Sequence, residues 1–131
     1  MPALNAAAAK GHVLAVDDCA ATRELMRASL ERMGYAVQAV DSGWAALQAM
    51  EQADFDAIVL DVEMPGMDGM AVGRALRHNP RTASVVIAMH TSVDEAAVRA
   101  EFSHYDAFVS KSAGPLALGD RVDGLLRSRR L

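Results

Sequence analysis

The sequence predicts an α/β fold, namely a doubly wound, five-stranded parallel sheet with about five helices around it. Two features indicate this fold. Short apolar runs without polar alternation are typical of strands that are buried on both faces of a parallel sheet. Between these runs, apolar residues recur at helical spacing, and alternating strands and helices favour right-handed crossovers within one sheet. The 131 residues suffice for one domain with a sizeable core.

The expected strands are short, and they cover residues 12–16, 35–40, 57–60, 84–89 and 106–110. Polar residues stand directly after four of these runs, namely Asp17 and Asp18, Asp61, His90 with Thr91, and Lys111. Because parallel strands end at the same edge of a sheet, we expect these side chains to meet there.

Helices are expected over residues 22–33, around residues 44–50, and over about residues 67–77, 94–102 and 115–130. The first helix has an apolar face and is ended by Gly34. Its face consists of Thr22, Met26, Leu30 and Met33. The last helix should turn four apolar residues inward, namely Leu118, Val122, Leu125 and Leu126.

Residues 1–11 are expected to form a flexible leader, because their run of alanines offers no core face. Residues 12–131 then form the domain. Its last helix reaches the end of the sequence, so we expect a domain that acts without an attached output domain.

Composition argues against several classes of protein. The formal net charge of −4 disfavours direct binding to nucleic acid, which relies on basic residues. No apolar run approaches the roughly 18 residues of a membrane span, and no signal peptide is recognisable, so we expect a cytoplasmic protein without membrane insertion. Cys19 is the single cysteine, which excludes an internal disulfide. We expect it to be a small buried residue rather than a reactive thiol.

The expected cluster of carboxylates has a chemical consequence. Three carboxylates in one crevice repel each other, so they persist only beside a cation or with raised pKa values. A few hard oxygen ligands with room for water suit Mg²⁺ or Mn²⁺.

Residues 61–69 read Asp-Val-Glu-Met-Pro-Gly-Met-Asp-Gly. Together with the acid pair, Thr91 and Lys111, this motif resembles the response-regulator receiver domain, the CheY-like family, over about residues 11–130. The resemblance implies a flavodoxin-like fold. It also implies that Asp61 accepts a phosphoryl group from a phosphohistidine on a sensor histidine kinase or a histidine phosphotransfer protein.

The resemblance implies further roles. Asp18 and Asp61 would bind Mg²⁺ directly with the backbone carbonyl of Glu63, and Asp17 would act mainly through water. Thr91 and Lys111 would contact the phosphoryl oxygens. Phe108 matches the aromatic position that turns inward on activation, although a permanently buried core residue is an equal alternative.

The sequence departs from the family pattern at three places. Ser112 follows Lys111 where the family has proline and a cis peptide bond, so a trans bond must be considered. The spacing from Thr91 to Lys111 is short, which predicts a shortened or displaced fourth helix. His90 replaces an apolar residue and is expected to be a packed or half-exposed strand residue, rather than a group that reports pH or touches the phosphoryl group.

Three functions compete. The leading prediction is a receiver that signals to a downstream protein through phosphorylation-dependent binding, with no catalysis beyond its own Mg²⁺-dependent phosphorylation and dephosphorylation. A receiver-like module that binds its partner without phosphorylation is the alternative. An aspartate-based phosphatase is the third, and the sequence provides no cap domain to enclose its substrate.

Overall fold

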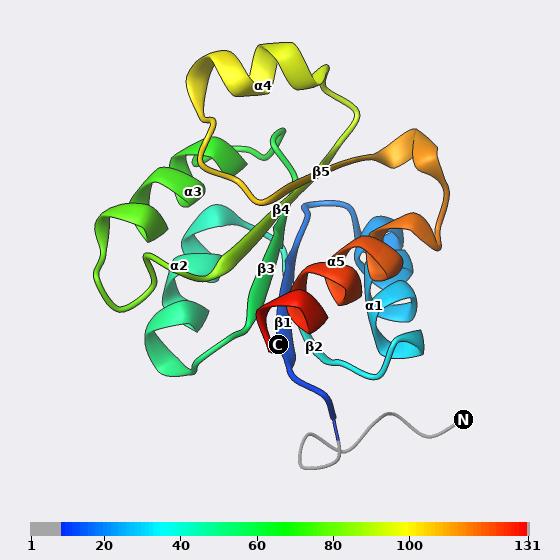
Figure 1. Cartoon of the computed structure of the whole chain (residues 1–131). Coiled ribbons are helices and arrows are strands. Elements are labelled where there is room, and N and C mark those ends of the chain that lie inside the picture. The colour runs from blue at the N-terminus through cyan, green and yellow to red at the C-terminus, as the bar shows by residue number, and fades with distance from the viewer. Residues whose placement is uncertain (1–8, 131) are drawn as a thin grey trace.

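The computed structural model of the chain describes residues 9–130 and confirms the predicted parallel sheet (Figure 1). Its strands are β1 (His12–Val16), β2 (Ala36–Val40), β3 (Ala57–Leu60), β4 (Val86–Thr91) and β5 (Ala107–Ser110). They pair in parallel in the order β2-β1-β3-β4-β5.

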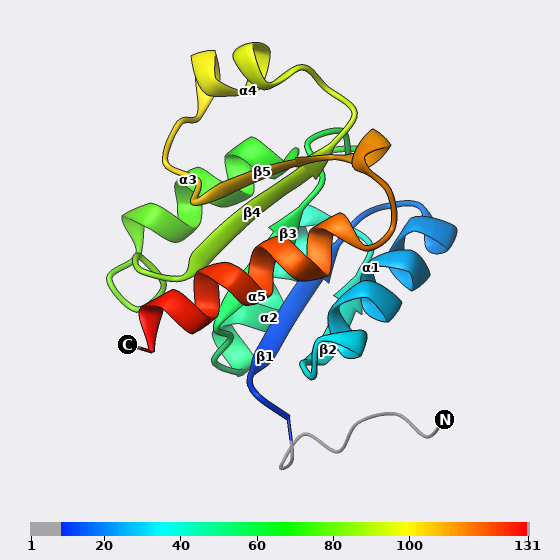
Figure 2. The same cartoon turned by 45° about the vertical axis from the view of Figure 1, so that its right-hand side comes forward.

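The helices alternate with the strands along the chain. They are α1 (Ala20–Arg32), α2 (Gly43–Gln52), α3 (Gly69–His78), α4 (Glu95–Glu101) and α5 (Ala117–Arg129), with a short 3-10 helix, η2 (Lys111–Ala113), before α5. Figures 1 and 2 show α1 and α5 on one face of the sheet and α2 and α3 on the other. In the described part of the chain, no helix is long and apolar enough to cross a bilayer.

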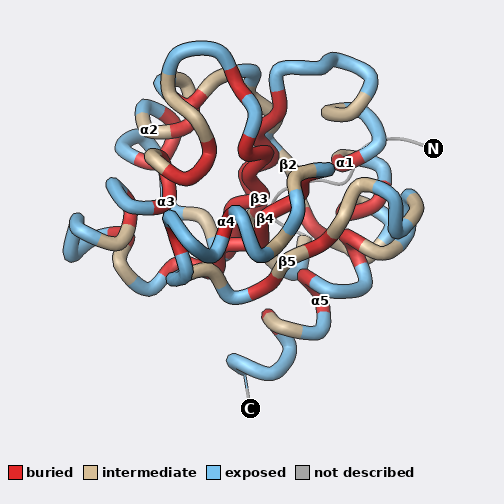
Figure 3. The backbone as a smooth tube through the Cα atoms, turned by 90° about the horizontal axis from the view of Figure 1, so that it is seen from above, coloured by how far each residue is buried: buried red, intermediate tan, exposed pale blue. Residues whose placement is uncertain are grey.

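The sheet is buried on both faces, which explains why its strands lack polar alternation. On β3, Ala57 and Val59 join the core beneath α1 and α5, whereas Ile58 and Leu60 join the core beneath α2 and α3. Seen from above in Figure 3, buried segments run along the strands and exposed segments lie around them.

Local capping sets where two helices begin. The Ser42 hydroxyl accepts a hydrogen bond from the Ala45 amide at the start of α2, and the Asp68 carboxylate accepts one from the Ala71 amide at the start of α3. The fourth helix, α4, has seven residues, as expected from the short spacing before Lys111.

Two expectations were wrong. β4 continues to Thr91 instead of ending at residue 89, because His90 and Thr91 pair with Val109 and Ser110 on β5. Cys19 is exposed rather than buried, because it occupies the N-cap position of α1 at the surface.

Part of the expected leader lies outside the described residues, namely residues 1–8. Lys10 is held in place. Its amide donates to the Gly34 carbonyl at 2.9 Å, and its ammonium group lies 3.1 Å from the buried Asp123 carboxylate. Asp123 also accepts a hydrogen bond from the hydroxyl of the buried Tyr35 at 2.7 Å.

Candidate functional site

The site lies where β1 and β3 end side by side, at the point where the strand order reverses. Asp17 follows β1 and Asp61 follows β3, and both residues are buried. The Asp61 amide donates to the Val16 carbonyl at 3.1 Å, which aligns the two strand ends. The sheet therefore fixes the two carboxylates next to each other.

Three carboxylates meet at this edge as predicted. One oxygen from each of Asp17, Asp18 and Asp61 lies within 4.8 Å of the others. Asp18 is exposed, which leaves one side of the cluster open to water. A small set of oxygen ligands with an open side fits Mg²⁺, which usually keeps several waters.

Asp17 itself supports this fit. Its Oδ1 accepts the Cys19 amide at 2.9 Å, but its buried Oδ2 has no hydrogen-bond partner among residues 9–130. The Lys111 ammonium lies 2.8 Å from Oδ2 and forms an ion pair with it. A buried carboxylate oxygen without a hydrogen bond is available to contact a metal ion or a water bound to that ion.

Lys111 reaches the acids from the end of β5, as predicted. Its Nζ lies 3.2 Å from Asp61 Oδ2 as well as 2.8 Å from Asp17. Burial alone would lower the pKa of Lys111, but the contacts with Asp17 and Asp61 outweigh it, so the pKa is raised. Burial and the neighbouring Asp17 raise the pKa of Asp61, although Lys111 opposes them.

The loop between β3 and α3 explains the Pro-Gly and Asp-Gly pairs of the motif. Gly66 has a φ of 80°, in the left-handed region that the turn after Pro65 requires. At Gly69 a Cβ atom would lie 2.0 Å from the Asp61 carbonyl oxygen, so only glycine lets α3 begin this close to the acceptor. The Glu63 amide donates to Asp61 Oδ1 at 3.4 Å. A role for the Glu63 carbonyl as a metal ligand stays a prediction.

The two residues expected to respond to phosphorylation lie on the neighbouring strands β4 and β5. Thr91 is fully buried at the end of β4, and its hydroxyl accepts the Val93 amide at 3.1 Å. Phe108 is half-buried on β5, with its ring centroid 6.1 Å from that of Tyr105. The switching role of both residues stays a prediction.

The Lys111–Ser112 segment adopts an ordinary backbone. All peptide bonds among the described residues are trans. Residues 111–113 form η2, and the Ser110 hydroxyl accepts the Ser112 amide at 3.3 Å. Lys111 therefore reaches both carboxylates without the proline that the family has next to it.

Sequence reasoning did not find every residue that shapes the site. Arg23 on α1 donates to the Asp17 carbonyl at 2.8 Å and so holds the end of β1. Its place early in the helix that follows the acid pair is the only sequence signal for this contact. His90 is a packed strand residue as predicted, but its Nδ1 is buried and has no hydrogen-bond partner in the described part of the chain. Burial and the nearby Lys111 lower the pKa of His90 to about 4.

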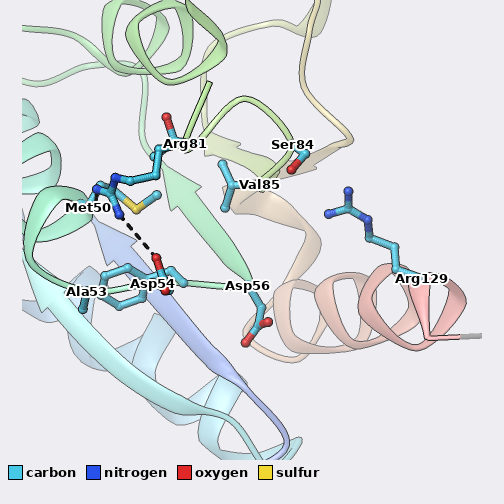
Figure 4. Close-up of a pocket in the computed structure, with 10 residues that line it drawn as sticks. Met50, Ala53, Asp54, Asp56, Arg81, Ser84, Val85 and Arg129 are labelled. Atoms are coloured by element: carbon cyan, nitrogen blue, oxygen red, sulfur yellow. Dashed lines mark hydrogen bonds and ion pairs between the residues drawn. The ribbon is translucent and has the colours of Figure 1, made fainter. Parts of the chain in front are cut away.

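A second pocket lies away from these residues, beside the amino end of β3 (Figure 4). Its charged groups are largely paired within the protein. Arg81 lies 3.3 Å from Asp54 and also donates to the Met50 carbonyl, and Asp56 accepts the His12 amide. None of the predicted site residues lines it, so the edge that carries Asp61 is the candidate site.

Comparisons with known proteins agree with this geometry. The family model of the response regulator receiver domain matches residues 13–123. The transcriptional regulatory protein ResD of Bacillus subtilis is 37% identical over 117 residues, covering 88% of this chain and 48% of ResD. The sensor histidine kinase GacS of Pseudomonas protegens is 49% identical over 65 residues, covering 50% of this chain and 7% of GacS. The chain thus spans less than half the length of these relatives.

Solved structures show the same fold. The chemotaxis response regulator CheY4 of Vibrio cholerae has a TM-score of 0.80 at 28% identity, covering 87% of this chain and 97% of CheY4. The response regulator TrrA of Thermotoga maritima, solved in complex with Mg²⁺-BeF, has a TM-score of 0.78 at 28% identity, covering 87% of this chain and 97% of that one. Because the family match covers most of the sequence and includes Asp17, Asp61 and Lys111, the chain belongs to the response-regulator receiver domains of two-component signalling.

Proposed function

We propose that this receiver is phosphorylated on Asp61, with Mg²⁺, by a sensor histidine kinase or a histidine phosphotransfer protein. The observation that supports this most directly is the position of Lys111, whose ammonium lies within 3.2 Å of both Asp17 and Asp61. A fixed cation beside the acceptor oxygen is what transfer of a phosphoryl group requires, because catalysis there rests on positioning and charge neutralisation.

Each residue has a definite part in the proposed reaction. An Asp61 oxygen attacks phosphorus, the bond between phosphorus and the donor's imidazole nitrogen breaks, and the imidazole leaves with the bonding electrons. Lys111 neutralises charge on the transferred oxygens, and the Thr91 hydroxyl donates to one of them. Asp18, Asp61 and the Glu63 carbonyl would hold Mg²⁺, with Asp17 acting through water, and the bound ion supplies additional positive charge at the phosphoryl oxygens.

The output that we propose is binding to a downstream protein, favoured in the phosphorylated state. The chain itself turns over no other substrate in this proposal, and it does not contact nucleic acid directly. The cytoplasmic location stays a prediction, which cell fractionation of the native protein would test.

The decisive experiment is incubation with acetyl phosphate and Mg²⁺, read by intact mass and peptide mapping. Wild type should gain one phosphoryl group on Asp61, and chelation of the metal should prevent the gain. Asp61→Asn should gain none. Asp54→Asn, which alters an exposed carboxylate, should behave like wild type. A wild-type protein that stays unmodified, or a label found elsewhere than Asp61, would contradict the proposal.

Two departures from the family favour the alternative, a module that binds without phosphorylation. The loop after Lys111 lacks the family's proline, and α4 has only seven residues. Such a module should not respond to Mg²⁺. The exposed Trp44 is a suitable probe, because its indole nitrogen lies 3.9 Å from where a Cβ of Gly66 would stand, in the loop that follows Asp61. Unchanged Trp44 fluorescence on Mg²⁺ titration would favour the module.

A further inference from the structure

A pocket between α1 and the start of α5 contains an unusual buried histidine. The pocket has a volume of about 350 Å³ and lies beside Lys111, on the face of the sheet that α1 and α5 cover. Its apolar wall consists of Leu25 and Met26 from α1 and of Pro115 and Leu118 from the other side. His90 lines the pocket from β4.

The histidine lacks what a buried polar group normally has. It is 9% exposed, and the four β4 residues before it, Val86 to Met89, are buried apolar residues. Its Nδ1 is buried without a hydrogen-bond partner among residues 9–130. Buried polar atoms are rarely left in this condition, so a partner from outside the chain, a water or a bound guest, is needed to satisfy the Nδ1 atom.

The loop that precedes α5 keeps the pocket open. Gly114 has a φ of 97°, and a Cβ atom there would have no other atom within 4 Å. The preceding residue, Ala113, is small and exposed, so neither residue fills the pocket with a large side chain. Leu25, which is 57% exposed, stands at the rim with apolar surface available for contact.

The charges of the pocket disfavour an ionic guest. Lys111 is the one permanently charged residue among those that line it, and its ammonium is already neutralised by Asp17 and Asp61. The low pKa of His90, about 4, leaves its imidazole neutral near neutral pH, with one nitrogen as donor and the other as acceptor. A guest that both donates and accepts one hydrogen bond complements such a ring.

We propose that this pocket binds a small, uncharged, amphipathic molecule of about two fused rings, whose hydroxyl or amide group pairs with His90 while its apolar body lies between Met26 and Leu118. The size follows from the volume, since a cavity of about 150 Å³ holds benzene and this pocket is more than twice as large. The site is distinct from the acceptor carboxylate, and Lys111 borders both.

Three probes with the same ring system test the proposal, namely naphthol, naphthalene and naphthoate. Binding is followed by NMR, through the methyl signals of Met26, Leu25 and Leu118. Naphthol should shift these signals and bind most tightly, because only naphthol is both uncharged and able to pair with His90. Naphthalene should bind about three- to tenfold more weakly, the range expected for one hydrogen bond. Naphthoate should bind weakest.

Variants distinguish binding in the pocket from nonspecific binding to the rest of the protein. His90→Leu should reduce the affinity for naphthol to that for naphthalene. Leu25→Trp should weaken the binding of both molecules, because the larger side chain narrows the entrance of the pocket. His104→Leu, an exposed histidine outside the pocket, should change neither. Equal binding of naphthol and naphthalene, naphthoate binding as tight as that of naphthol, full naphthol affinity in a folded His90→Leu protein, or shifts spread away from Met26 and Leu118 would each overturn the proposal.

Discussion

Removing the charge of Asp61 should stabilise the protein when no divalent cation is present. Oxygens of Asp17 and Asp61 lie within 4.8 Å of each other, and two unit charges at that separation repel by about 3.5 kcal/mol at an effective dielectric of 20. Lys111 and the Glu63 amide offset part of this repulsion. The raised pKa of Asp61 shows that burial and Asp17 outweigh them. We therefore expect Asp61→Asn to raise the free energy of unfolding by about 1–2 kcal/mol.

Mg²⁺ should reverse the order of stability of wild type and Asp61→Asn. A cation that binds only the folded state stabilises wild type by about 2.7 kcal/mol at a concentration one hundred times its dissociation constant. Asp61→Asn lacks one charged ligand, so its gain should be much smaller. Without Mg²⁺ the variant is then more stable than wild type, and at saturating Mg²⁺ wild type equals or exceeds it.

Urea unfolding near neutral pH, followed by circular dichroism, measures both effects. NaCl at the same ionic strength as the MgCl₂ separates specific binding from screening. Asp54→Asn is the matched control, because it removes a carboxylate that is 98% exposed and should leave the response to Mg²⁺ unchanged. A less stable Asp61→Asn protein in the absence of metal, together with no stabilisation of wild type by Mg²⁺, would refute the reasoning.

Three further predictions concern single residues. The pKa of His90 falls from 6.5 to about 4 on folding, so the folded state binds fewer protons than the unfolded state between these values. The neutral His90 therefore contributes about 3 kcal/mol to the free energy of unfolding, which is present in full above pH 6.5 and is lost as the pH falls towards 4. The free energy of unfolding of His90→Leu, measured over the same pH range, should lack this loss. Gly69→Ala should lower the free energy of unfolding by more than about 2 kcal/mol, because its Cβ would meet the Asp61 carbonyl oxygen. The control Gly124→Ala, where a Cβ meets no other atom, should be neutral or stabilising when both variants are unfolded by heat. Ser42→Ala should cost about 1 kcal/mol in urea unfolding through loss of the α2 cap, and a cost near zero would contradict that role.

The acceptor side of the site was predictable because local chemistry determines it. A buried apolar run fixes β3, the Pro-Gly pair fixes the turn, and Asp68 caps the helix that follows. The sequence separation between Asp17 and Asp61 did not matter, since parallel strands place their ends at one edge. The structure brings Lys111 to the same edge as predicted.

What could not be predicted depends on contacts between distant segments. Thr91 belongs to β4 because β5 pairs with it, and no residue near Thr91 in sequence indicates that pairing. The exposure of Cys19 follows from the start of α1 one residue later, a boundary that periodicity locates only within a few residues. The unpartnered nitrogen of His90 depends on the packing of α1 and α5 over β4, which no local pattern encodes.

The charge balance of the site explains how phosphorylation could change the molecule in the proposed function. Lys111 supplies one positive charge to Asp17 and Asp61 together, and a phosphoryl group adds about 1.5 to 2 negative charges. Lys111 then has a stronger partner than Asp17, and moving towards it changes the contacts of β5 and η2, from which Lys111 extends. A shift of the resting population from 1:99 to 99:1 requires about 5.5 kcal/mol of differential stabilisation. The exchange of partners at Lys111 links the phosphoryl group to β5 and η2, so Lys111→Met should abolish phosphorylation-dependent partner binding even where Asp61 is still modified.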